Sequence, residues 1–220
     1  MRIASFVVVG AALLALSPAT ASAQRPVHVN FGGGPTFLFG DLGDRFGTGW
    51  GPAIGVSVGS GRLEGQFEYA YRWFDVKDEL PINATRFSAN HHMHQLDFNL
   101  RANLSPRDAA VRPYAVVGPG VYHRTVEITE YEGTGVICDP YWYVCGVYPV
   151  SSVVGSRSSW DWGFNIGGGV GFGLGEEAEF YIEMRYHYTG GPDFEPPPGV
   201  SGTGGSATGN YLPLTFGFRF

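Results

Sequence analysis

The last ten residues, YLPLTFGFRF, constrain the fold of this chain more tightly than any other segment. Alternate positions form a wholly apolar face, which carries Leu212, Leu214, Phe216, Phe218 and Phe220. The other face carries Tyr211, Pro213, Thr215, Gly217 and Arg219. Strict alternation predicts a β-strand, and large apolar side chains along one whole face need cover from another layer. A transmembrane β-barrel covers such a face with lipid, so the rest of the chain should supply partner strands of the same polarity.

The amino terminus has the pattern of a secretory signal peptide. Arg2 is the only charged residue before Gln24, and an apolar run extends from Phe6 to Leu16. The segment Ala21-Ser22-Ala23 then supplies a small-x-small cleavage site. The run is too short for a spanning helix, which needs about 20 apolar residues. We therefore expect a signal peptide at 1–23 and one exported domain at 24–220.

The composition favours an all-β exported protein. The chain contains 34 Gly, 16 Phe, 12 Tyr and 5 Trp, residue types that suit strands and turns and form helices poorly. Its 14 Lys and Arg residues are outnumbered by 20 Asp and Glu residues, so no basic patch for nucleic acid is expected. The two cysteines suggest one disulfide. We predict neither a cofactor nor a metal.

Eight alternating runs lie along the chain, at 27–40, 50–59, 63–74, 91–104, 111–123, 160–174, 178–188 and 211–220. Most are long enough to cross a bilayer at a tilt, which takes about 9–11 residues. Short connections at 60–62, 105–110 and 175–177 alternate with long ones at 41–49, 75–90, 124–159 and 189–210. This layout predicts an eight-stranded antiparallel up-and-down transmembrane β-barrel, with both termini on the periplasmic, short-turn side. The last run should close the barrel against the first, near Val27 and Val29.

The charged residues of these runs fall on one face. A lipid-facing Arg or Lys costs about 2–4 kcal/mol at the bilayer midplane, so lipid would enforce this segregation. We expect an interior charge network made of Glu64, Glu68, Arg72, Asp97, Arg101, Arg112, Asp161, Glu179, Glu183, Arg185 and Arg219. The runs 27–40 and 111–123 are less clear, because apolar residues occupy both faces and only Arg112 indicates a direction.

A soluble, lipocalin-like barrel is the main alternative, with its apolar face turned inward. Glycine argues against it, because the non-apolar faces of runs 50–59 and 160–174 are rich in glycine. Small residues suit a crowded barrel interior and gain nothing on a solvated surface. A predicted aromatic girdle at the long-loop ends also favours a membrane, and it consists of Trp50, Tyr71, Trp73, Trp160, Trp162, Tyr186, Tyr188 and Tyr211.

The leader, the eight runs, RPYAVVGPGVY at 112–122 and the closing YLPLTFGFRF together resemble the small outer-membrane barrels of the OmpA-domain, OmpX and OmpW type, the outer membrane protein β-barrel domain family. The resemblance implies an integral protein of the bacterial outer membrane, surrounded by its lipid. It also implies that Phe216, Phe218 and Phe220 form part of the signal read by the barrel-assembly machinery. These side chains also suit simple contact with lipid. We expect a monomer.

Two activities compete with a purely structural or surface-interaction role. The first is a narrow channel for ions or for small or hydrophobic solutes. Six acids and five arginines in an eight-stranded lumen should instead pair as a salt-bridged plug, because unpaired buried charges cost several kcal/mol each.

The second activity is lipid A modification, which similar barrels perform with a His, a Ser and an acid. The candidates are His91, His92, His94 and His187. The nearest match to a His-x-Ser motif ends at Thr189 instead of serine, and no nucleophile–base spacing stands out. His92 and His94 share a strand face, which suits a metal or, more commonly, a membrane rim. We predict no enzymatic activity.

The connection 124–159 carries the features that suit a surface contact. A bridge between Cys138 and Cys145 would close a loop of eight residues and stabilise it by roughly 2.5 kcal/mol. It would present Tyr141, Trp142 and Tyr143 on a constrained tip, where aromatic side chains make good contact anchors. Protection from proteolysis is the alternative role of the bridge.

Overall fold

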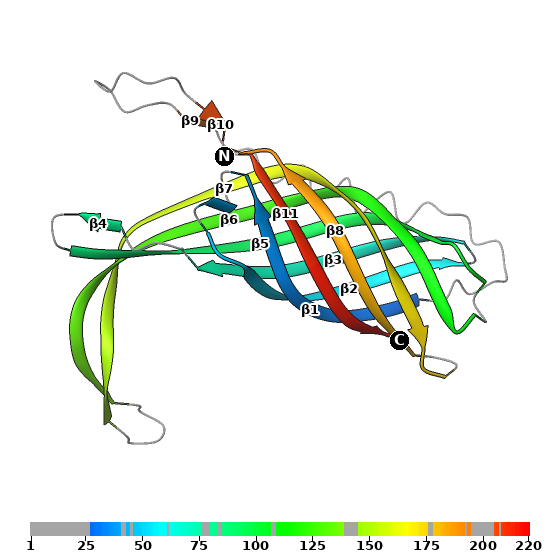
Figure 1. The fold of residues 1–220 in the computed structure, drawn as a ribbon, viewed down its shortest axis with the longest axis horizontal. Helices are drawn as coiled ribbons and strands as arrows, with labels where there is room; N and C mark the ends of the chain where they lie inside the picture. Colours follow the sequence, from blue (N-terminus) through cyan, green and yellow to red (C-terminus); the bar gives the residue numbers. More distant parts are fainter. Residues whose placement is uncertain are drawn as a thin grey trace, which may run out of the picture.

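The computed structural model shows a closed antiparallel β-barrel (Figure 1). It describes residues 27–40, 43–44, 46–60, 62–75, 80–82, 85–106, 109–138, 145–175, 178–191, 193–194, 205–206 and 208–220. The wall consists of β1 (Val27–Phe39), β2 (Gly49–Ser60), β3 (Leu63–Asp75), β5 (Thr85–Asn103), β6 (Val111–Cys138), β7 (Cys145–Gly173), β8 (Glu179–Thr189) and β11 (Gly209–Arg219). Short strands β4 (Leu80–Ile82), β9 (Asp193–Phe194) and β10 (Gly205–Ser206) lie outside the wall. The predicted eight-stranded up-and-down barrel is confirmed.

The barrel closes where the last strand meets the first. Each wall strand pairs antiparallel with its neighbour in the chain, and β11 pairs with β1. Val29 and Phe220 exchange both backbone hydrogen bonds, at 2.9 Å each, and Phe31 lies opposite Phe218. The closing YLPLTFGFRF segment therefore seals the ring, and its predicted contact with the first strand is confirmed. Among the described residues, no helix is long and apolar enough to cross a membrane.

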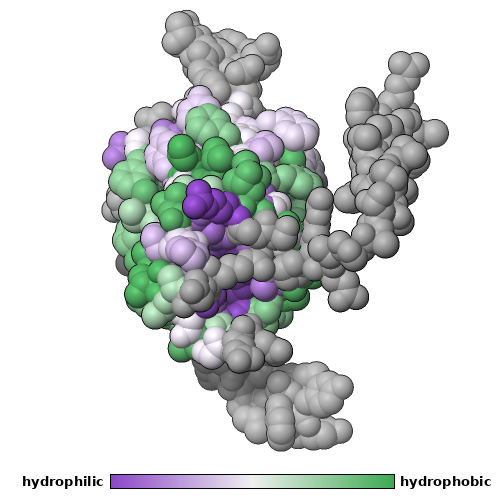
Figure 2. Space-filling view, turned by 90° about the vertical axis from the view of Figure 1, so that its right-hand side faces the viewer, coloured by the Kyte–Doolittle hydropathy of each residue, from purple (hydrophilic) through white to green (hydrophobic). Residues whose placement is uncertain are grey.

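The two faces of the wall differ in polarity, as the alternation predicts. Large apolar side chains are exposed around the outside, whereas the buried side chains inside are mostly polar or charged. Figure 2 views the end that carries the short turns, and hydrophilic side chains fill its middle with hydrophobic ones around them. The structure also settles the two ambiguous runs. Asn30 and Thr36 of β1 and Tyr114 and Tyr122 of β6 point inward.

Tyr211 does not belong to the aromatic girdle, so this part of the prediction is wrong. It is 1% exposed and lies inside the barrel, where its ring stacks on His187 with centroids 4.7 Å apart. The reason is strand parity, since Tyr211 shares the inward face with Thr215 and Arg219. Its aromatic character suggested the interface, but its position along β11 determines its direction.

The connection 124–159, predicted as a long loop, is mostly strand. β6 and β7 stay paired from Val111–Phe172 out to Cys138–Cys145, with register shifts at 128/129 and 131/133. The hairpin projects past the barrel and bends away from it (Figure 1). β5 also starts earlier than predicted, at Thr85, and pairs with β6 as far as Glu130. Alternating Thr, Val and Ile residues favour strand here even without a barrel to join.

The inward glycines leave room for long polar side chains. A Cβ atom on Gly169 would lie 2.5 Å from both the Ile182 carbonyl oxygen and the Tyr114 hydroxyl. We expect Gly169→Val to destabilise the barrel by about 1–3 kcal/mol through overpacking. The measurement is urea unfolding, followed as the fraction that keeps the heat-modifiable mobility of a folded barrel on a gel.

Gly65→Val provides the matched control. Gly65 faces outward, and the nearest atom to its Cβ position is the Val58 carbonyl oxygen at 3.9 Å. This substitution should leave stability unchanged or slightly raised. Equal losses in the two variants would contradict the role given to Gly169.

Candidate functional site

The lumen is filled by polar side chains in layers. All eleven ionisable residues predicted for the interior lie on the inner face of the wall, and each is buried except Arg112, which is partly exposed. The layers run from the short-turn mouth, through a central cluster around Arg185, to an apolar cover at the long-loop end. They decide whether anything can pass through the barrel.

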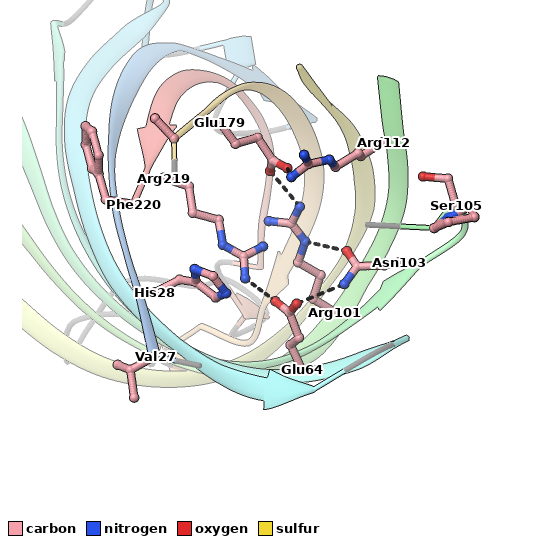
Figure 3. A pocket seen from close by; sticks show the side chains of 12 residues that line it. Val27, His28, Glu64, Arg101, Asn103, Ser105, Arg112, Glu179, Arg219 and Phe220 are labelled. Carbon is pink, nitrogen blue, oxygen red and sulfur yellow. Dashed lines mark hydrogen bonds and ion pairs between the residues drawn. The ribbon is translucent and has the colours of Figure 1, made fainter. Parts of the chain in front are cut away.

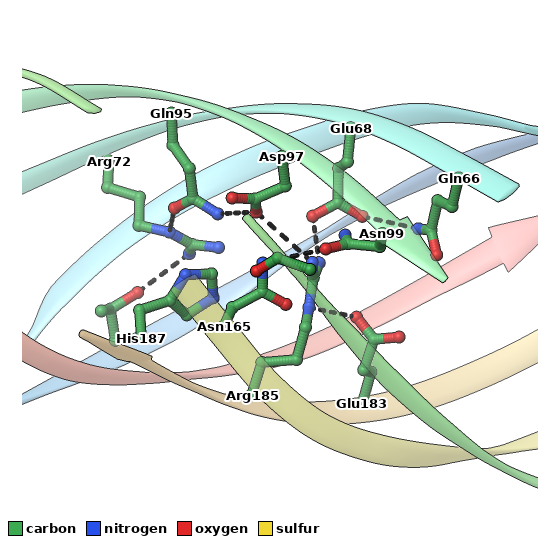
Figure 4. A network of polar contacts seen from close by, with 12 residues as sticks. Gln66, Glu68, Arg72, Gln95, Asp97, Asn99, Asn165, Glu183, Arg185 and His187 are labelled. Carbon is green, nitrogen blue, oxygen red and sulfur yellow. Dashed lines mark hydrogen bonds and ion pairs between the residues drawn. The ribbon is translucent and has the colours of Figure 1, made fainter. Parts of the chain in front are cut away.

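The central layer is built on Arg185 of β8 (Figure 4). Its guanidinium group contacts Glu68, lies 3.4 Å from Asp97 Oδ2 and places Nε 2.7 Å from Glu183 Oε1. Gln66 donates to Glu68 over 3.0 Å, and Gln95 donates to Asp97. Three carboxylates from three strands therefore surround one fully buried cation. This layer ties β3, β5 and β8 together across the lumen.

The next layer toward the long-loop end combines Arg72 with aromatic side chains. Arg72 donates to Thr36 Oγ1 over 2.9 Å and to Gln95 Oε1 over 3.3 Å. The Tyr211 hydroxyl donates to the same Gln95 oxygen over 2.9 Å. Arg72 is fully buried, and these neutral oxygen atoms accept its hydrogen bonds.

Tyr122 of β6 links this layer to the central one. Its hydroxyl donates to Asp97 Oδ1 over 3.2 Å and lies 3.0 Å from Nδ1 of His187. Sequence reasoning did not include Gln95 or Tyr122 among the site residues, and it considered His187 only as a catalytic candidate. The sequence alone could have identified them, because each lies an even number of residues from a predicted interior charge on the same strand and therefore faces inward.

An apolar cover closes the long-loop end. Phe46, Phe74 and Met93 pack with Tyr122 and Tyr211 as one buried cluster. The space that Phe74 and Met93 share with Arg124 and Tyr211 has no volume for a water molecule. Arg124 pairs with Asp161 at 2.6 Å beside this cover. Arg124 was missed because the prediction placed it in a loop.

The short-turn mouth is open and holds a cavity of about 440 Å³ (Figure 3). Arg101 and Arg112 bind the two oxygens of Glu179 at 2.9 and 3.2 Å, and Arg219 pairs with Glu64. Asn103 joins the pairs, because it accepts from Arg101 and donates to Glu64. The described part of the lumen is therefore open at one end and filled above it.

The remaining predicted site residues lie on the outer wall or in the hairpin. Phe216, Phe218 and Phe220 are exposed on the outside of β11. Cys138 and Cys145 are register partners in β6 and β7, and residues 139–144, which include the three tip aromatics, lie outside the described ranges.

The four candidate histidines are separated by the wall. His91 and His187 are buried inside, with His91 between the rings of Phe46 and Phe74 at 5.0 and 5.1 Å. His92 and His94 face outward. In the described ranges, no group of His, Cys, Asp or Glu residues could hold a metal ion. The histidines therefore do not form one site.

Comparisons with known proteins agree with this architecture. The sequence profile of the outer membrane protein beta-barrel domain matches residues 6–220. A search of curated protein sequences found no match. A major outer membrane protein from Thermus thermophilus superposes with a TM-score of 0.53 at 13% identity, covering 89% of this chain and 99% of that one.

Two further solved structures are similar at lower scores. Neisserial surface protein A has a TM-score of 0.49 at 14% identity, over 88% of this chain and 95% of that one. The attachment invasion locus protein Ail of Yersinia pestis has a TM-score of 0.45 at 11% identity, over 90% of this chain and all of that one (100%). At these identities the likeness concerns the fold alone.

The central layer predicts a large stability cost for losing its cation. Arg185→Met would leave Glu68, Asp97 and Glu183 buried without their partner, so we expect the free energy of unfolding to fall by about 3–5 kcal/mol. Arg112→Met is the matched control, since Arg112 is partly exposed and Arg101 still pairs with Glu179. It should cost about 1 kcal/mol or less. Urea unfolding in the same detergent measures both, and a similar loss in the two variants would show that the central layer is not special.

Proposed function

This chain belongs to the family of outer membrane protein beta-barrel domains, and we propose that it is a plugged, non-enzymatic barrel that presents a protruding β-sheet for contacts at the cell surface. It is an integral protein of the bacterial outer membrane. The hairpin of β6 and β7 is the part of the barrel that would make these surface contacts.

The outer edge of β7 is the main observation in favour of a binding role. Pairing with β8 begins at Gly163, and within the described ranges no strand pairs with residues 145–160 on the side away from β6. A long unpaired edge offers backbone donors and acceptors to which an extended segment of a partner can add as a further strand. Such an edge is an aggregation hazard unless it is used or blocked. Arg157 is the only charged residue of this segment, so charge protects it little.

The orientation that suits this role places the hairpin outside the cell. The long connections and the hairpin lie at one end of the barrel, and the short turns and Phe220 lie at the other (Figure 1). Outer-membrane barrels keep short turns in the periplasm and long loops outside. We therefore propose that both termini are periplasmic.

The tip of the hairpin adds a second element. We propose that Cys138 and Cys145 form a disulfide, because they face each other as the last register pair of β6 and β7. The bridge would restrict the segment that contains Tyr141, Trp142 and Tyr143, and these aromatic residues would then act as contact anchors.

Transport and catalysis receive less support. Arg72, Arg185 and their partners occupy the lumen, and an eight-stranded barrel is just wide enough for side chains to fill. His187 is buried on the inner wall beside Tyr122, away from any lipid substrate. The outward-facing candidates His92 and His94 make hydrogen bonds to tyrosine hydroxyls rather than to a serine nucleophile.

An inert barrel makes a direct prediction. The reconstituted protein should give no stable porin-sized conductance in planar bilayers, because the charge network blocks the lumen. Lipid A from cells with and without the protein should have the same acyl count by mass spectrometry. A trimeric porin in the same bilayers is the positive control. A reproducible open level in the first assay, or a changed acyl count in the second, would refute the proposal.

The hairpin itself can be removed without cutting the barrel. Thr129 and Val153 are register partners, so joining them through Asn-Gly deletes residues 130–152 and leaves a two-residue turn. We expect an immobilised library of extended peptides to capture intact cells through the full hairpin, because such peptides can add to the β7 edge as a further strand, and the shortened variant to lose this binding while keeping heat-modifiable mobility.

A triple variant, Tyr141→Ala/Trp142→Ala/Tyr143→Ala, separates the strand edge from the tip. It keeps the edge and should weaken binding about tenfold, as the loss of aromatic anchors usually does. Binding that is equal in the full and the shortened protein would contradict a role for the hairpin.

A further inference from the structure

Three histidines lie on the outer wall toward the long-loop end, in the midst of the aromatic girdle. His94 of β5 is exposed, and His92 of β5 and His123 of β6 are half-buried. Tyr71, His94, His123 and Trp160 are successive register partners on β3, β5, β6 and β7. We call these four residues and His92 the histidine strip.

The rings of the strip touch one another across four strands. Ring centroids are 5.0 Å apart between Tyr71 and His94, 6.0 Å between His94 and His123, and 4.6 Å between His123 and Trp160. His92 stacks on Tyr71 with centroids 6.0 Å apart. The strip is therefore one continuous surface rather than three separate histidines.

Tyrosine hydroxyls fix the orientation of two of the rings. Nδ1 of His94 lies 2.8 Å from the Tyr69 hydroxyl, and Nδ1 of His92 lies 2.9 Å from the Tyr71 hydroxyl. When the hydroxyl donates to Nδ1, the ring proton sits on Nε2. A protonated ring also carries a proton there. Nε2 then remains as a donor for a partner outside the protein.

The surroundings suit a lipid with a charged head. Two residues closer to the short-turn end on each strand, Leu96, Val121 and Trp162 are successive register partners. They form an apolar surface for acyl chains. Trp160 within the strip and Trp162 next to it are 69% and 75% exposed, so both indole rings are available to a lipid. Tyr, Trp and His at this level face the headgroup region, where phosphates are the main anions.

We propose that the histidine strip is a binding site for a lipid whose headgroup carries phosphate monoesters, of the lipid A type, in the leaflet next to the long-loop end. His94 and His123 donate to the phosphate, Tyr71 and Trp160 flank it, and an acyl chain lies along Leu96 and Val121.

Other groups near the strip limit the headgroups that fit it. Tyr69 and Tyr71 face the histidines from β3, and Trp160 faces them from β7. Asp75 and Glu127 share one register row with Asn90, two residues beyond His92 toward the long-loop end. These carboxylates disfavour a second phosphate farther out.

The test measures lipid retention by native mass spectrometry. Wild-type protein in detergent is incubated with bisphosphorylated lipid A, with dephosphorylated lipid A or with phosphatidylglycerol. We expect bisphosphorylated lipid A to bind at least about tenfold more tightly than either other lipid.

His94→Phe/His123→Phe, which keeps the rings and removes their N–H donors, should remove this preference, whereas His28→Phe, which changes a histidine at the short-turn mouth, should preserve it. The variant with the shortened hairpin should also retain lipid, so failure of the surface-contact proposal would leave this one standing. Equal retention of dephosphorylated lipid or of phosphatidylglycerol, or an unchanged preference in the double variant, would overturn the proposal. If the double variant does not fold, nitrogen NMR of the wild-type histidines decides instead: no shift of their Nε2 signals on adding lipid A would also overturn it.

Discussion

The reciprocal backbone hydrogen bonds between Val29 and Phe220 are the constraint on which the rest of the structure depends. Hydrocarbon offers no partner for a free N–H or C=O group, so a sheet in a membrane must close on itself. Closure turns the alternation of each strand into an inside and an outside. The last residue of the chain completes that ring, and lipid then covers the apolar face that the sequence displays so clearly.

Closure with eight strands also determines the chemistry of the interior. The lumen has room for side chains and little else, so every charge that points inward must find a partner there. Arg185 pairs with three carboxylates and Glu179 pairs with two arginines. Asn103 forms hydrogen bonds that link the ion pairs at the mouth. Glycines such as Gly169 supply the space for these long side chains. The lumen is blocked because it is narrow along its length, and not because of any single contact.

Much of this architecture is predictable from the sequence, because lipid and strand parity act on every residue in the same way. The strand count, the closing contact and the direction of most side chains follow from alternation alone. Tyr211 was misplaced because its residue type was given more weight than its parity. Arg124 and the β6–β7 extension were missed because a strand outside the membrane carries polar residues on both faces, and only pairing between strands distinguishes it from a loop.

The apolar cover formed by Phe46, Phe74 and Met93 separates the charge network from the hairpin above it. Changes in the hairpin therefore do not expose the buried ion pairs to water. The hairpin and the charge network can vary independently over evolution. The same insulation makes the turn between β6 and β7 a natural graft point. A foreign peptide inserted there would be displayed on the hairpin, and the stability of the barrel would not depend on the inserted sequence.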